Sequence, residues 1–271
     1  MRIYIPTIGR IDKQLTVDRL TPELCKKFNV ALVTSPGEAK ALREATEGKG
    51  VSVLSCRANG ISDTRQWILD FHKREWDAKD PVVLMLDDDL PTWRQRAGEV
   101  NAKGETPYTK ATTKEIEKGL TFFAKLMKDH AHGSIGHALF CQVSPLLKFN
   151  SRMLRALAYN VKLIPKGTEF RLQVMEDFDM ELQLLTQGLP SVTYNGIVQD
   201  QHQNNSAGGC SGYRTLEVQA AAAHRLKELW PDLVTVVTRA PAREWIGMGG
   251  ERTDVRINWS RAAKGVSRHE S

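Results

Sequence analysis

Three consecutive aspartates, Asp87, Asp88 and Asp89, directly follow the apolar run VVLML and precede a Leu-Pro pair. Like charges at this spacing repel one another, so the cluster requires a counter-charge. A divalent cation supplies that charge and can bridge carboxylates to phosphate oxygens. The alternative is a helix cap with surplus acid, but a cap uses a single aspartate. The pattern therefore favours a site for a metal ion or a nucleotide.

A second acidic group lies in the stretch MEDFDMEL, which is typical of a helix start. Its acids are Glu176, Asp177, Asp179 and Glu181. Acids in a first turn interact favourably with the helix dipole, which is a purely structural explanation. The functional explanation is a general base facing an acceptor hydroxyl, with a pKa moved toward neutrality by neighbouring carboxylates. The residues alone favour neither explanation.

A late histidine, His202, follows a strand-like segment and precedes the polar, glycine-rich loop QNNSAGGCSGYR. A neutral imidazole there could complete the coordination of a manganese- or magnesium-like ion held by Asp89. Arg214, at the end of this loop, could contact phosphates. His132 and His137 flank a glycine-rich turn, and we interpret them as structural.

The elements that must position these groups alternate between strands and helices over the first ninety residues. Strands are expected at RIYIPTI, NVALVTS, GVSVLSC and PVVLML, and helices over 38–47 and 63–76. The last of these strands is a continuous apolar run, as in parallel strands buried on both faces. Ligands bind beyond the carboxyl ends of such strands, where the aspartates lie. The chain is therefore predicted to form an α/β sheet with nucleotide-binding potential.

The later segments are read in the same way. Residues 91–111 show no steady period and contain Pro and Gly, so a long loop carrying Trp93 and Tyr108 is expected beside the aspartates. A capping-box pattern at Thr112 predicts a helix start. HALFCQVSPLL is strand-like, and SRMLRALAYNVKLIP is expected to contain a basic helix. SVTYNGIVQD is a further expected strand, and residues 215–229 a further helix.

Composition and charge narrow the class of protein. The 271 residues are 41% hydrophobic and 26% charged, which is ordinary for a globular domain. No apolar run approaches the roughly 18 residues of a membrane span, and the N-terminus lacks a signal-peptide core. A cytoplasmic protein without membrane contact is therefore expected. The scattered cysteines argue against a zinc knuckle or a disulfide framework.

Basic residues gather in residues 148–171 and 252–268, within a net charge of +6. Most basic clusters are solvated surfaces, and the phosphates of a nucleic acid are the alternative partner. Arg152 and Arg155 are the candidates for DNA contact in the first cluster.

The order of five features resembles a nucleotide-sugar glycosyltransferase of the GT-A type. They are IYIPTIGR, GISDTRQWILDF, VVLMLDDDL, MEDFDMELQLLTQG and the late histidine. The resemblance covers residues 1–215 and implies a GT-A-like, Rossmann-type sheet, mixed but mainly parallel and flanked by helices. Residues 216–271 would then be a helical and basic C-terminal extension packed on the same domain.

More specifically, IPTIGR, LMLDDDL and RTDVRINWSR resemble the TET-associated glycosyltransferases, which are mainly bacteriophage enzymes thought to glycosylate hydroxymethylated pyrimidines in DNA. The resemblance implies a metal-dependent transfer from a nucleotide-sugar, such as a UDP-sugar, to 5-hydroxymethylcytosine or 5-hydroxymethyluracil in double-stranded DNA. A viral enzyme would act in the host cytoplasm. The alternatives are a GT-A enzyme for a glycan or protein acceptor, a metal-dependent nucleotidyltransferase module, and an inert DNA-binding protein.

The resemblance also implies residue roles. The donor side would comprise Pro6, Thr7, Arg10, Arg65, Asp87, Asp88 and Arg214. The ligands of Mn²⁺ or Mg²⁺ would be Asp89, His202 and Asp87. Asp177 is the first candidate for the acceptor base and Glu176 the second. Trp93 and Tyr108 would stack on an extruded or neighbouring base, with Arg152 and Arg155 on the phosphates. Because Pro-Thr-Trp-Arg follows the acids directly, which aspartate binds the metal stays open.

Overall fold

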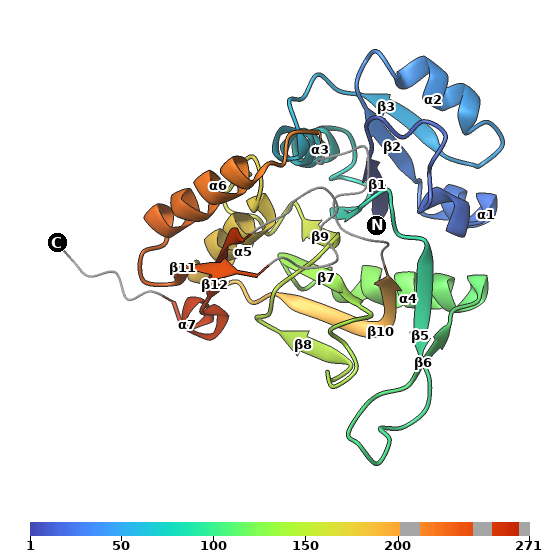
Figure 1. Cartoon of the computed structure of the whole chain (residues 1–271). Coiled ribbons are helices and arrows are strands. Elements are labelled where there is room, and N and C mark those ends of the chain that lie inside the picture. Colours follow the sequence, from blue (N-terminus) through green and yellow to red (C-terminus); the bar gives the residue numbers. More distant parts are fainter. Residues whose placement is uncertain (201–211, 241–250, 266–271) are drawn as a thin grey trace.

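The computed structural model describes residues 1–200, 212–240 and 251–265, and a large mixed sheet lies at its centre (Figure 1). The sheet order is β3-β2-β1-β4-β9-β7-β10-β5-β6, and β8 also pairs with β10. The strands are β1 (Arg2–Pro6), β2 (Ala31–Thr34), β3 (Ser52–Ser55), β4 (Val82–Leu86), β5 (Thr92–Arg96), β6 (Tyr108–Lys110), β7 (His132–His137), β8 (Leu147–Phe149), β9 (Ala156–Asn160) and β10 (Val192–Asp200). Strands β1 to β4 pair in parallel, as do β7 and β10, whereas β9 runs antiparallel between β4 and β7. The predicted α/β fold with a mixed, mostly parallel sheet is confirmed.

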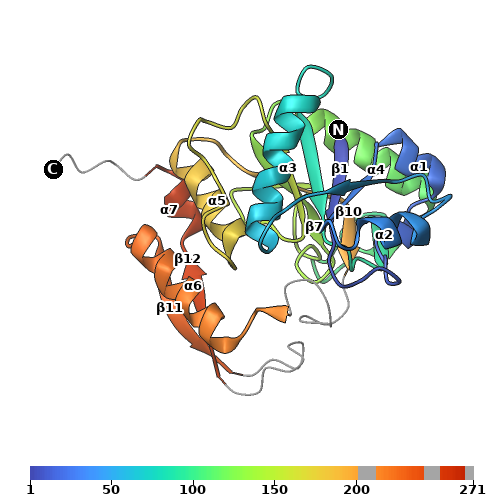
Figure 2. The same cartoon turned by 90° about the horizontal axis from the view of Figure 1, so that it is seen from above.

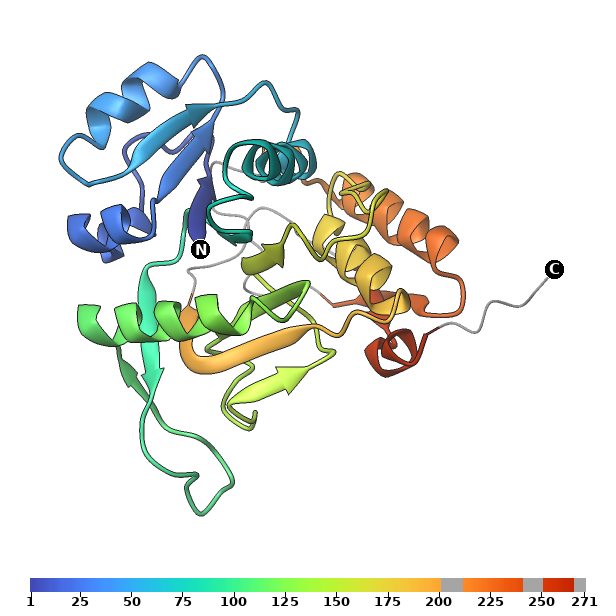
Figure 3. The same cartoon turned by 180° about the vertical axis from the view of Figure 1, so that it is seen from behind.

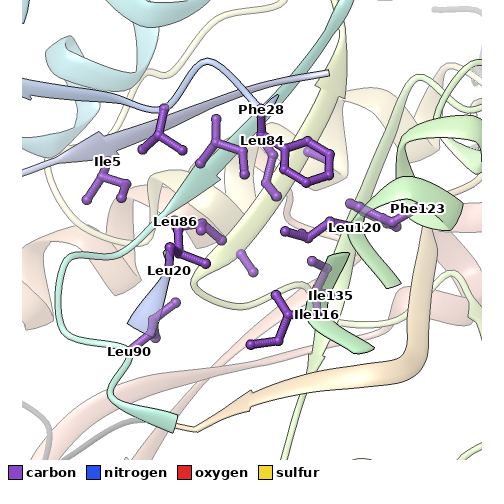
Figure 4. Close-up of a cluster of buried hydrophobic side chains, with 14 of the residues drawn as sticks. Ile5, Leu20, Phe28, Leu84, Leu86, Leu90, Ile116, Leu120, Phe123 and Ile135 are labelled. Carbon is purple, nitrogen blue, oxygen red and sulfur yellow. The ribbon is translucent and has the colours of Figure 1, made fainter. Parts of the chain in front are cut away.

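Helices cover both faces of this sheet. They are α1 (Pro22–Lys27), α2 (Ala39–Ala45), α3 (Ile61–Glu75), α4 (Thr113–Leu126) and α5 (Glu176–Thr186), with a short 3-10 turn at Val17–Arg19. Alternation along β1 explains the two faces, because Ile3 and Ile5 pack in one core cluster with α1 and α4 (Figure 4), and Tyr4 packs in the other with α3 and α5. Strand β4 is fully buried and serves both clusters, as its continuous apolar run predicted.

The C-terminal part contains α6 (Leu216–Leu229), β11 (Val234–Arg239), β12 (Arg252–Ile257) and α7 (Trp259–Ala263). Strands β11 and β12 form a separate antiparallel pair. A third core cluster joins Phe178 and Leu182 of α5 to Leu226 of α6 and Ala262 of α7, and Figure 2 shows these elements beside α5. The division between residues 215 and 216 stays a prediction.

Three local predictions were wrong. Residues 91–111 are not one long loop, because β5 and β6 form an antiparallel hairpin whose connecting loop extends away from the body (Figure 3). Residues 151–165 contain no helix; β9 lies there instead, since its small and apolar side chains fit between β4 and β7. The stretch 137–147 is mainly turn, between the end of β7 and the start of β8.

Other local predictions were confirmed. The expected helix over 63–76 is α3, the capping box forms between Thr112 and Glu115, and the expected helix over 215–229 is α6. Among the residues that the structure describes, no helix has the length and apolar character needed to cross a membrane. Cys25, Cys56 and Cys141 are buried and free.

Candidate active site

The aspartate run lies where β1 and β4 end side by side. Thr7, which follows β1, donates a hydrogen bond of 2.7 Å from its hydroxyl to Asp88. Arg10 forms an ion pair with Asp88, and its Nη1 lies 3.3 Å from Asp89 Oδ2. The structure thus brings the predicted donor-side residues of β1 onto the aspartates of β4, with Pro6 as the last residue of β1.

The aspartates are also joined to the second acidic group, and Arg65 of α3 makes the connection. Its Nη2 donates to Asp87 Oδ1 at 3.2 Å, and its Nη1 donates to Glu176 Oε1 at 2.5 Å. One guanidinium therefore ties the end of β4 to the first turn of α5. The sequence placed Arg65 on the donor side, but it did not indicate that Arg65 spans both acidic groups.

Burial disfavours the charged forms of the acids in this arrangement. Arg65 and Glu176 have side chains that are only 7% and 5% exposed. Burial raises the pKa of Glu176 to about 7, and the nearby charge of Asp177 adds to this rise. Burial likewise raises the pKa of Asp87 to about 6, and Asp89 adds to that rise. The positive charge of Arg65 acts in the opposite direction on both acids. Burial is therefore the main reason that the pKa values of both acids are raised, and the neighbouring carboxylates add to it.

Two non-glycine residues beside these acids adopt left-handed backbone conformations. Met175, directly before α5, has a φ of 63°, and Arg155 has a φ of 60°. The carbonyl of Arg155 accepts a hydrogen bond of 2.9 Å from the amide of Asp87. Such conformations cost roughly 1–3 kcal/mol each, and they cluster at functional sites. Here they direct the chain into the Asp87 and Glu176 contacts.

The remaining acids of α5 differ in their surroundings. Asp179 is fully buried and accepts hydrogen bonds from Arg171, Gln183 and Trp230, so it anchors structure. Glu181 accepts bonds of 3.1 Å from the Met153 amide and the Ser191 hydroxyl, and burial raises its pKa to about 8. Asp177 is half-buried. Its Oδ1 accepts the backbone amide of Phe178, the next residue along the chain.

The four residues predicted to contact DNA differ in their exposure and in their contacts. Trp93 is 2% exposed in the core beside β5, so the structure contradicts its stacking on a base. Tyr108 is half-buried, and its hydroxyl donates to the carbonyl of Asn195 at 2.9 Å. Arg152 is exposed and lies 4.6 Å from the centre of the Phe178 ring. The Nη1 of Arg155 lies 2.8 Å from the Nε2 of His137. The sequence indicated only a structural role for His137.

The structure describes only part of the predicted set of metal ligands. Within the described ranges, no three His, Cys, Asp or Glu side chains are grouped so as to hold a metal ion. His202 lies outside the described residues. Asp87 and Asp89 present the carboxylate oxygens that Mg²⁺ accepts when substrate phosphates supply further ligands. Arg214 is close enough to Glu176 for its charge to lower the pKa of that acid.

Comparison with known proteins decides the family. A family model described as TET-Associated Glycosyltransferase matches residues 1–209 of the chain. The chain belongs to the TET-associated glycosyltransferases. It is therefore a glycosyltransferase, and no curated protein matches it.

Solved structures similar to this glycosyltransferase are distant. One is 4-diphosphocytidyl-2C-methyl-D-erythritolsynthase from Anaerococcus prevotii DSM 20548, at 12% identity and a TM-score of 0.44, covering 72% of this chain and 88% of that one. Another is the apo-form glycosyltransferase GlyE of Streptococcus pneumoniae TIGR4, at 14% identity and a TM-score of 0.36, covering 70% of this chain and 44% of that one.

Proposed function

We propose that this glycosyltransferase transfers a sugar from a nucleotide-sugar donor, such as a UDP-sugar, to the hydroxymethyl group of a modified pyrimidine in double-stranded DNA. The observation that carries the proposal is the bridge that Arg65 makes between Asp87 and Glu176. It joins the residues expected to hold the donor to the helix expected to activate the acceptor. Family membership supports the sugar transfer itself.

The donor would bind at the ends of β1 and β4, beside Thr7, Arg10 and the aspartates. Asp87 and Asp89 would hold Mn²⁺ or Mg²⁺, and His202 remains a predicted third ligand. When bound, such an ion stabilises negative charge on a diphosphate leaving group.

Asp177 would act as the general base, because it is half-buried and so open to an acceptor, whereas Glu176 is buried against Arg65. The acceptor hydroxyl oxygen attacks the anomeric carbon of the sugar and forms a new carbon–oxygen bond. The bond between that carbon and the diphosphate breaks, and its electron pair leaves with the nucleoside diphosphate. Asp177 takes the hydroxyl proton. Glu176 and Arg65 hold the first turn of α5 against Asp87, so that the base faces the donor.

A direct assay tests the proposal. The protein would be mixed with Mn²⁺, a panel of UDP-sugars and duplex DNA that contains 5-hydroxymethylcytosine or 5-hydroxymethyluracil, followed by mass spectrometry of the nucleosides. The expected result is a hydroxymethyl nucleoside with one added sugar, and unmodified DNA serves as the control. An absence of any sugar adduct with every donor would refute the DNA acceptor. Donor hydrolysis that persisted in that case would favour a glycan or protein acceptor.

A further inference from the structure

A pocket of about 190 Å³ is lined by His137, which contacts Arg155, and the proposed function leaves this pocket without a ligand. It is formed by β7, the turn after it, β8, the segment after β8, and β10. Its lining includes Ser134, His137, Phe140, Lys148, Arg152 and Thr193. Drug-sized ligands occupy roughly 300–1,000 Å³, so this pocket is too small for a whole nucleotide-sugar. Its size suits a single planar ring.

The pocket is connected to the proposed active site by two contacts. His137, in its lining, is hydrogen-bonded to Arg155, whose carbonyl in turn accepts the amide of Asp87. Arg152, also in its lining, lies over the ring of Phe178, the residue after Asp177. A group held in this pocket is therefore close to both the aspartate run and the proposed base.

Phe140, which lines the pocket, belongs to a segment that exposes several apolar side chains. Five large hydrophobic side chains within residues 139–149 are at least 45% exposed, namely Leu139, Phe140, Val143, Leu146 and Phe149. Single exposed apolar residues are ordinary on a protein surface, but a contiguous group marks a contact site. Phe140 is 61% exposed, and the centre of its ring lies 5.5 Å from that of His137.

The charge of the lining is positive. Lys148 and Arg152 are exposed cations, and none of the described residues that line the pocket is acidic. An aromatic ring beside cations is the arrangement with which proteins hold unpaired nucleotides, through base stacking and phosphate contacts. The hydroxyls of Ser134 and Thr193, 2.9 Å apart, add polar groups within the pocket.

We propose that this pocket receives the acceptor pyrimidine after it is extruded from the duplex. This inference rests on the proposed function. Phe140 stacks on the extruded base or fills the space that it leaves, and Lys148 and Arg152 contact the flanking phosphates. The hydroxymethyl group then faces Asp177 from the side opposite the donor. Extrusion is required because a base inside the duplex is inaccessible to an enzyme that modifies it.

Base extrusion can be measured with 2-aminopurine placed beside a hydroxymethylcytosine in duplex DNA, because its fluorescence rises when stacking is lost. The full-length wild-type protein is expected to raise this signal. Phe140→Ala is expected to abolish the rise and to increase the Kd for the DNA roughly 5- to 150-fold. Phe122→Ala, which removes a 44% exposed ring from α4, is the matched control.

The phosphate contacts are tested separately by salt titration. Lys148→Ala and Arg152→Ala should each make the negative slope of log K against log salt less steep by about 0.9. Lys40→Ala, at an exposed position of α2, should leave the slope unchanged. Equal slopes for all three variants would contradict the assignment, as would a Phe140→Ala protein that extrudes the base normally.

The outcomes also separate this inference from the proposed function. Wild-type protein that extrudes the base but transfers no sugar would support the pocket and refute the transfer. Normal transfer by Phe140→Ala, Lys148→Ala and Arg152→Ala would support the transfer and overturn the pocket. A glycan or protein acceptor would leave the aminopurine signal at background for every variant, and that result would overturn both.

Discussion

Two carboxylates on helix α5, three residues apart, show how the same chemical group can serve two purposes. Glu176 and Asp179 are both buried, at 4% and 0% exposure, and each pairs with an arginine. Arg171 donates two hydrogen bonds to Asp179, at 2.8 Å and 2.6 Å, and Trp230 and Gln183 add one each. Arg65, by contrast, divides its nitrogens between Glu176 and Asp87.

The difference lies in how completely each acid is compensated. Asp179 accepts four hydrogen bonds, and these donors come from α5 itself, the segment before it and the residue after α6. It therefore fastens the C-terminal elements to α5. Glu176 shares its arginine with a second acid, and its burial raises its pKa to about 7. A shared, incompletely compensated charge is characteristic of an active site, whereas a saturated one is characteristic of a structural anchor.

The largest effect, on the rate of sugar transfer, is expected at Asp177, the proposed base next to Glu176. Asp177→Asn removes the proposed acceptor of the hydroxyl proton, so the rate of sugar transfer should fall by roughly 10²- to 10⁴-fold. Donor affinity, measured by calorimetry, should remain unchanged. A variant that transfers sugar at a near-normal rate would exclude Asp177 as the base, and the same assay on Glu176→Gln would then examine the second candidate.

On the Asp179 side, we expect a loss of stability rather than of chemistry. Asp179→Ala leaves Arg171 and the Trp230 indole without their buried acceptor, and loss of one partner of a buried pair costs roughly 3–5 kcal/mol. Urea unfolding would measure this change. Trp230→Phe removes a single hydrogen bond and should cost about 1 kcal/mol. Equal small losses for both variants would contradict the role of Asp179 as an anchor.

A smaller effect is expected at Glu181, two residues further along the same helix. Its pKa is about 8 in the folded protein, so between pH 4.5 and 8 the folded state binds a proton that the unfolded state releases. Its contribution to stability is therefore complete below its unfolded pKa and is lost as the pH rises through 8. Relative to Glu181→Gln, the wild type should lose roughly 1–3 kcal/mol of unfolding free energy between pH 5 and 8.5. Parallel pH profiles for the two proteins would rule this out.

Much of the fold was predictable because local pattern and tertiary context agree. The apolar run of β4, the capping box at Thr112 and the helix over 215–229 are read directly from the sequence. Strand β9 was missed because ALAYN has helix-forming residues, and its neighbours β4 and β7 supply the hydrogen bonds that make it a strand. Trp93 was misplaced because its segment is mostly polar, and pairing with β10 buries it.

The candidate site was predictable only in its parts. The aspartate run and the acids of α5 were identified by type and spacing. Their connection through Arg65 was not predicted, because Arg65 is 22 positions from Asp87 and 111 positions from Glu176 along the chain. The pocket around His137 and Phe140 gave a signal in the sequence, the largely apolar stretch HALFCQVSPLL, but this stretch was interpreted as a strand. Exposure of those side chains is a property of the fold that sequence pattern does not report.

Sugar transfer by Arg65→Met, compared with Arg171→Met, tests the central claim most directly. Each variant removes one arginine that pairs with a buried acid of α5, and transfer is measured per folded molecule at a temperature where circular dichroism shows both to be folded. We predict that Arg65→Met lowers kcat/KM roughly 100-fold, because donor and base sides lose their alignment. Arg171→Met should stay within about threefold of the wild type while unfolding more easily, as expected for a structural ion pair. Near-normal transfer by Arg65→Met, or an equal loss in both variants, would contradict the account.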